Sequence, residues 1–259
     1  MIRKLLIVSA AGAALSVACI TAATALVSHD LGDHGWNWTF TRSGDHIRFV
    51  KGTPGPVPAE ASKSLAWTGG DLLSVATDAD VEYVPGDTPS VTVTGSKDDI
   101  DRIRLDGGRI FSVGEPDHDH TVTVHFGDGG VDADRHSGGV KVVVTAPGVK
   151  RFEVSGSGGL TVRSYDQATL DLALTGSGDA ELNGHTDAVK LNVSGSGDAD
   201  LSALQTRDAD ITVSGSGGSE IAATGKATID ISGSGNVELK TKPESVSSHV
   251  SGSGSLDQD

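Results

Sequence analysis

Six Gly-Ser-Gly tripeptides recur at nearly constant spacing in the second half of this chain. They begin at Gly156, Gly176, Gly195, Gly215, Gly233 and Gly252, which are 20, 19, 20, 18 and 19 residues apart. A fixed period of this length is the mark of a fold built from stacked copies of one short unit.

Apolar residues hold fixed places relative to each tripeptide. Two residues before the first Gly stand Val154, Leu174, Val193, Val213, Ile231 and Val250. Four residues before it stand Phe152, Leu172, Leu191, Ile211, Ile229 and, as the exception, Ser248. A period of two is typical of a strand with one apolar face. A constant offset from unit to unit means that like positions stack and bury an aliphatic column, which a single unit cannot close. We therefore predict an all-β fold, a right-handed parallel β-helix (β-solenoid) with coils of 18–20 residues.

Other repetitive β folds fit the spacing less well. An immunoglobulin-like sandwich would not keep side chains in register at this period, and a propeller blade needs about twice its length. At this period residues 65–259 would form roughly ten coils, and because each coil climbs about 4.8 Å, they predict a rod about 50 Å long. We expect the glycines to supply tight bends, often with positive φ, and a close approach between neighbouring coils.

The N-terminus has the pattern of an export signal. Arg3 and Lys4 precede an uncharged, mostly apolar run from Leu5 to Val27. Residues 1–27 therefore predict a signal peptide, cleaved after Ala25, or an N-terminal membrane anchor, and lipidation at Cys19 is a third alternative. Residues 28–64 are rich in Gly, Pro and charge and predict a flexible linker. The alternation of Trp36, Trp38 and Phe40 is also compatible with a short strand in this segment.

Charge and cysteine content restrict the partners. The formal net charge is −15, which argues against binding to nucleic acid or to anionic lipid. Cys19 is the single cysteine, so no disulfide can form within the chain. We expect a membrane contact only through residues 5–27, if these are not cleaved.

The repeated Val-Ser-Gly-Ser-Gly units resemble the bacterial head GIN domain of auto-transporter adhesins, a family of largely unknown function. The segment Val81-Glu82-Tyr83-Val84-Pro85-Gly86-Asp87, followed by Ser90-Val91-Thr92-Val93, is also similar to the start of that domain. The resemblance covers about residues 65–256 and implies a β-solenoid with an adhesin-like role. It brings no catalytic residue with it.

Two metal sites deserve consideration. The acidic, His-containing segment from Asp117 to His136 offers His118, His120 and His125 as candidate zinc or copper ligands, and a solvated polar excursion is the alternative. Calcium would need a carboxylate after every Gly-Ser-Gly, but the residues there are Gly159, Asp179, Asp198, Gly218, Asn236 and Ser255. These residues are better interpreted as turn formers, and we expect no cofactor.

We predict an exported cell-envelope protein, in the periplasm or at the cell surface, that acts as a non-catalytic adhesin-like binding or structural scaffold. Its partner would be an envelope or extracellular ligand, a glycan or a protein. The alternative is a polysaccharide-active β-helix enzyme, which would need carboxylates gathered in a cleft. The outward residues from Arg151 to Asp230 are instead mixed in sign and scattered. We expect a monomer, because Ser248, Asp257 and Asp259 would discourage pairing at the last coil.

Overall fold

The computed structural model describes the backbone of residues 36–43, 46–51, 61–114, 120–127, 130–136 and 139–258, and the side chains of residues 61–114 and 139–258. The chain forms two compact units. The first comprises residues 1–57 and 117–138, and the second comprises residues 58–116 and 139–259. Within the described residues, no helix has the length and apolar character needed to cross a membrane.

The described part of the first unit is a four-stranded antiparallel sheet in the order β10-β9-β1-β2. Its strands are β1 (Trp36–Ser43), β2 (His46–Lys51), β9 (His120–Gly127) and β10 (Gly130–His136). Within residues 28–64, for which the sequence predicts a flexible linker, residues 36–43 and 46–51 form β1 and β2, and β3 (Ala61–Leu65) begins there as well. The alternation from Trp36 to Phe40 was the stronger signal, because a period of two favours a strand.

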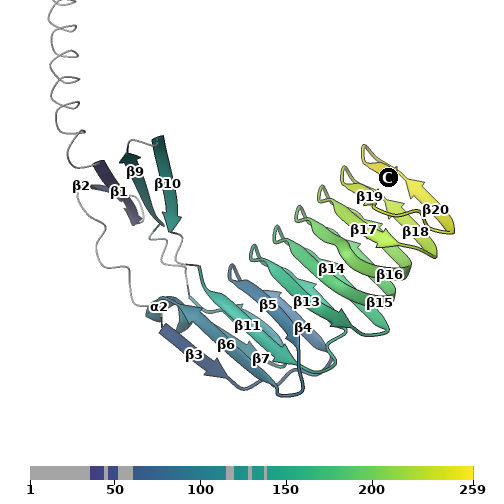
Figure 1. The fold of residues 1–259 in the computed structure, drawn as a ribbon, viewed down its shortest axis with the longest axis horizontal. Coiled ribbons are helices and arrows are strands. Elements are labelled where there is room, and N and C mark those ends of the chain that lie inside the picture. The colour runs from purple at the N-terminus through teal and green to yellow at the C-terminus, as the bar shows by residue number, and fades with distance from the viewer. Residues whose placement is uncertain are drawn as a thin grey trace, which may run out of the picture. The chain divides into compact units, whose positions relative to one another are not determined.

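The second unit contains the solenoid and the elements at its N-terminal end (Figure 1). The first elements are β3, β4 (Leu72–Ala76), β5 (Asp80–Pro85), β6 (Ser90–Gly95), α2 (Lys97–Ile100), β7 (Ile103–Asp106), β8 (Arg109–Ser112) and β11 (Lys141–Ala146). They are followed by β12 (Arg151–Val154), β13 (Leu160–Asp166), β14 (Thr169–Leu174), β15 (Ala180–Val193) and β16 (Ala199–Val213). The last are β17 (Ser219–Ala223), β18 (Lys226–Ile231), β19 (Asn236–Leu239), β20 (Ser245–Val250) and β21 (Ser255–Gln258).

Successive coils stack in parallel through two columns of strands, one on each side of the Gly-Ser-Gly turns. The first column runs through β4, β12, β14, the second half of β15, the second half of β16, β18 and β20. The second column runs through β5, β13, the first halves of β15 and β16, β17, β19 and β21. This arrangement confirms the predicted solenoid of stacked parallel coils.

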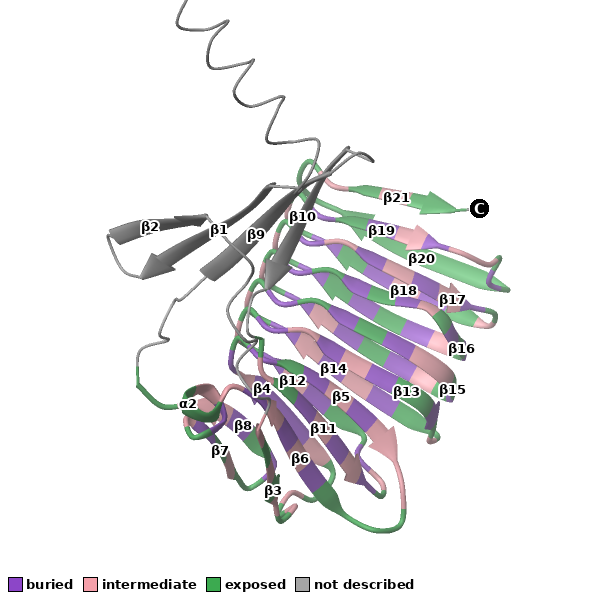
Figure 2. Cartoon of the chain, turned by 60° about the vertical axis from the view of Figure 1, so that its left-hand side comes forward, coloured by how far each residue is buried: buried purple, intermediate pink, exposed green. Residues whose placement is uncertain are grey.

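The interior is the aliphatic column that the repeat predicts. Leu172 pairs with Leu191, Leu191 with Ile211, and Ile211 with Ile229, and each of these four side chains is at most 1% exposed. Figure 2 shows buried residues alternating with intermediate or exposed ones along most strands of both columns, whereas β20 is exposed throughout. Full burial of one such side chain is worth about 1.5–3 kcal/mol, so the stacked column stabilises the fold without a disulfide.

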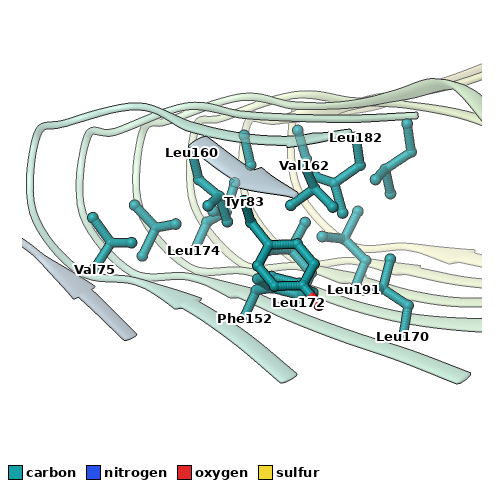
Figure 3. Close-up of a cluster of buried hydrophobic side chains, with 14 of the residues drawn as sticks. Val75, Tyr83, Phe152, Leu160, Val162, Leu170, Leu172, Leu174, Leu182 and Leu191 are labelled. Atoms are coloured by element: carbon teal, nitrogen blue, oxygen red, sulfur yellow. The ribbon is translucent and has the colours of Figure 1, made fainter. Parts of the chain in front are cut away.

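Aromatic side chains fill the start of this column (Figure 3). The rings of Tyr83 and Phe152 pack edge to face with centroids 5.3 Å apart, and those of Phe152 and Tyr165 do so at 6.0 Å. The Tyr83 hydroxyl donates to the Ala146 carbonyl at 2.8 Å, and the Tyr165 hydroxyl donates to that of Thr169 at 2.6 Å. Burial raises the pKa of both phenols, so they stay neutral and structural at physiological pH.

The glycines of the repeat are required by the distance between coils. A Cβ atom on Gly176 would lie 2.1 Å from the carbonyl oxygen of Gly156, and one on Gly195 would lie 1.9 Å from that of Gly176. The expectation of frequent positive φ is wrong, because among the glycines of the six tripeptides only Gly252 has one, at 142°. Thr77 and Ala79 stand at the corresponding places in the first coil, directly below Gly156 and Gly158.

The start of the solenoid differs from a simple succession of coils. Leu73 in β4 pairs with Phe152 in β12, although β6, α2, β7, β8 and β11 lie between them in the chain. Strand β11 pairs with β5 in parallel and with β6 antiparallel, and β8 pairs with β4. Residues 86–146 therefore contribute the N-terminal end of the solenoid and two strands of the other unit. For this reason the first column has seven strands among the described residues, where the sequence predicts roughly ten coils.

Candidate binding surface

The predicted metal ligands fall outside the side chains that the structure describes. His118 has no described position, and His120 and His125 belong to β9, where only the backbone is described. Their role in binding a metal stays a prediction. Among the described side chains, no group of three or more His, Cys, Asp or Glu residues is arranged to hold a metal ion.

The outer face of the first column balances its charges. Arg151, Asp171, Lys190 and Asp210 lie in register on successive coils, so that opposite charges are neighbours. Cross-strand pairs of opposite charge stabilise a sheet, whereas like charges directly opposite one another destabilise it. This row agrees with the mixed charges that the sequence indicates.

One outward row of the second column carries charges of one sign. In register from coil to coil stand Glu82, Thr161, Glu181, Asp200, Glu220, Glu238 and Asp257. We call these seven residues the acidic row. The analysis of the sequence missed this row, although its signal was present: Thr161 and the acids after it stand five residues past the first Gly of each tripeptide.

A second set of carboxylates runs beside the acidic row at the turns. Asp179 Oδ1 accepts from the backbone N–H of Asp198 at 2.8 Å, and Asp198 Oδ1 accepts from that of Gly218 at 2.5 Å. Asn236 Oδ1 accepts from the N–H of Ser255 in the same way, at 3.0 Å. Each side chain thus holds the backbone of the next coil, which agrees with the interpretation of these residues as turn formers.

Cations neutralise the acidic row at two places. Glu82, whose side chain is 17% exposed, lies 2.8 Å from Lys141 Nζ and 2.5 Å from Arg163 Nε. These two cations hold the pKa of Glu82 below its ordinary value, the bond from Lys141 having the larger effect. Further along, Lys240 Nζ lies 2.5 Å from Glu238 and 3.6 Å from Glu220. Between these places, no Lys or Arg of the described residues lies within 4.0 Å of Asp179, Glu181, Asp198 or Asp200.

The surface is hollowed where the acidic row is interrupted. Gly159 and Thr161 are short and uncharged, and they lie between Asp80 and Glu82 of the first coil and Asp179 and Glu181 of the third. Two shallow hollows share Gly159 and Thr161: one of about 360 Å³ reaches Asp80, Glu82 and Lys141, and one of about 350 Å³ reaches Asp179, Glu181, Asp198 and Asp200. We call the two together the acidic groove. Its chemistry suits the binding of positive charge.

Several known proteins of similar sequence or fold are described as putative adhesins. Residues 130–243 match the model of a family described as "putative auto-transporter adhesin, head GIN domain". A crystal structure of a putative adhesin from Bacteroides fragilis NCTC 9343 is similar with a TM-score of 0.55 and 14% identity, over 79% of this chain and 99% of that one.

A putative adhesin from Parabacteroides distasonis ATCC 8503 has a TM-score of 0.49 and 16% identity, over 78% of this chain and 98% of that one. No curated protein matches the chain. The repeat, the stacked coils and the family match agree with one another. Residues 130–243 are thus similar to the head GIN domain of the auto-transporter adhesin family.

Proposed function

We propose that this protein is an exported, non-catalytic scaffold of the bacterial cell envelope that binds an extracellular or envelope ligand through the outer face of its solenoid. The observation that carries the proposal is the acidic row, a regular polar surface on a rigid stack. The adhesin-like family supports the same role. Fixed side chains on stacked strands form an extended surface of the kind that solenoid proteins use for binding.

The polysaccharide-active alternative finds less support in the geometry. Glycosidases place a pair of carboxylic acids on either side of the bond to be cleaved. The carboxylates of Asp179 and Asp198 hold the backbone of the next coil, and Asp200 accepts from the N–H of Ser202 at 2.9 Å. The outward rows of the described solenoid strands also carry no Phe, Tyr or Trp that could stack on a sugar ring.

Two measurements test the proposal. Fractionation of cells expressing the full chain, with mass determination of its mature N-terminus, should place the protein outside the cytoplasm. Incubation of the purified protein with alginate, chitosan and dextran should release no reducing ends over a heat-inactivated control. Retention in the cytoplasm would contradict export, and release of reducing ends would establish the enzymatic alternative.

A further inference from the structure

We propose that the acidic groove docks an extended, basic segment of a partner protein, with Lys or Arg side chains set against Glu181 and Asp200. This inference rests on the proposed binding role and gives that role a partner of stated chemistry. It starts from the contrast between the two columns of one solenoid.

The one-sided charge of the second column is costly for the fold itself. Neighbouring strands lie about 4.8 Å apart, so carboxylates in register on adjacent coils repel one another. The first column avoids this repulsion by alternating Arg151, Asp171, Lys190 and Asp210. The same chain therefore compensates charge on one face and leaves it uncompensated at Glu181 and Asp200 on the other. A cationic partner would remove that repulsion.

The hollow is an independent observation that places the contact. Its floor is Gly159 and Thr161, and a Cβ on Gly159 would lie 3.2 Å from Asp80 Oδ1. A partner chain can therefore approach the solenoid more closely here than over the coils that follow, where acidic side chains occupy the row. Depth and charge coincide at the same coils, because Asp179, Glu181, Asp198 and Asp200 line the adjoining hollow.

The chemistry of the groove favours a polypeptide over a sugar. Lys and Arg have long stems that let the charged group reach a carboxylate from an extended backbone, and the guanidinium of Arg matches a carboxylate in two parallel hydrogen bonds. The residues that line the two hollows include no aromatic side chain on which a sugar ring could stack. Exposed charge pairs contribute up to about 1 kcal/mol each, so several are needed for measurable affinity.

A peptide-binding experiment with charge-matched variants tests the proposal. The probe is a fluorescein-labelled 12-residue peptide of alternating Arg and Ser, titrated with the purified protein and followed by fluorescence anisotropy. The double variant Glu181→Gln with Asp200→Asn removes two charges from the groove. The double variant Asp171→Asn with Asp210→Asn removes two charges from the first column. Circular dichroism verifies that each variant is folded.

We expect the groove variant to weaken binding roughly tenfold, the sum of two exposed pairs, and the first-column variant to weaken it less than twofold. A third variant, Thr161→Tyr, keeps all charges and fills the groove, so it should also weaken binding roughly tenfold. Equal weakening by both double variants, or unchanged binding by Thr161→Tyr, would refute the acidic groove as the docking site. The binding would then reflect only the general attraction of a basic peptide to an acidic protein.

Two further outcomes would also refute the inference. Absence of binding by the basic peptide would overturn the groove as a cation-docking surface. Tighter binding of chitosan than of the peptide, lost in the groove variant, would replace the polypeptide with an amino sugar polymer. Neither result touches the broader scaffold role, which depends on export and on the absence of released reducing ends.

Discussion

The replacement of Gly215 by Ala should open the solenoid at a single coil. A Cβ atom on Gly215 would lie 1.9 Å from the carbonyl oxygen of Gly195, at least 1.1 Å closer than the 3.0 Å that Cβ atoms tolerate. The same carbonyl accepts the N–H of Ser216 at 3.1 Å, and the carbonyl of Val193 accepts that of Ser214 at 2.8 Å. A displacement of about 1 Å would break both bonds. Each bond left unmade costs about 1–3 kcal/mol, so we expect Gly215→Ala to lose about 3 kcal/mol of unfolding free energy.

Thermal unfolding followed by circular dichroism measures this loss. For a unit of this size, about 3 kcal/mol corresponds to a decrease in Tm of roughly 6–12 °C. Gly70→Ala is the matched control, because no atom lies within 4 Å of the Cβ it would introduce. The control should melt within about 1 °C of the parent. If Gly215→Ala also melts there, the contact between coils does not explain the repeated glycines.

Four other predictions follow from single sites. Ile211→Asp should destabilise the protein by several kcal/mol in urea unfolding, because it buries an unpaired charge in the aliphatic column; a parent-like midpoint would contradict the register. Ser219→Ala should raise the unfolding free energy by about 1 kcal/mol, because the Ser219 hydroxyl is buried without a hydrogen-bond partner; a lower urea midpoint would show that it has one. Glu82→Gln should lower Tm at pH 7, and the difference from the parent should shrink as the pH falls below 4.5 and through the lower pKa of Glu82 in the folded protein, because the lowered pKa stabilises the fold only while the carboxyl is ionised; a difference that does not shrink below pH 4.5 would exclude this cause. A chelator such as EDTA should leave Tm within a few degrees of the untreated protein, since the carboxylates after the tripeptides do not recur on every coil; a larger decrease would indicate a structural calcium row.

The repeat predicts the stacked part of the fold well because each coil repeats one set of local demands. The inward positions must be apolar, so the offsets of Leu172, Leu191 and Ile211 from their tripeptides also give their register in space. The turn demands Gly for the same reason on every coil, although that reason is the approach of the preceding coil and not the sign of φ. Because every coil needs the same apolar and glycine positions, a single sequence shows the pattern several times.

The N-terminal end could not be predicted in this way, because it occurs once. The pairing of Leu73 with Phe152 joins residues far apart in the chain, and no periodic pattern links them. Likewise, Thr77 and Ala79 do not match the Gly-Ser-Gly pattern, although they occupy the same turn positions in the first coil. The strands of residues 36–51 pair with each other and with β9, so their stability depends on partners that local composition does not show.

The acidic row was missed for a different reason, since its pattern was visible at a constant offset. The inward rows of a solenoid must pack against one another, so their composition indicates the fold and nothing about function. Outward rows are free of that demand, so a row that departs from charge balance reports a further constraint. The first column shows what such a row contains when stability decides it, with Asp171 between Arg151 and Lys190. The second column departs from that pattern at Glu181 and Asp200, beside the hollow over Thr161. Comparison of the two columns within one chain thus separates charges that strand pairing explains from charges for which we propose a partner.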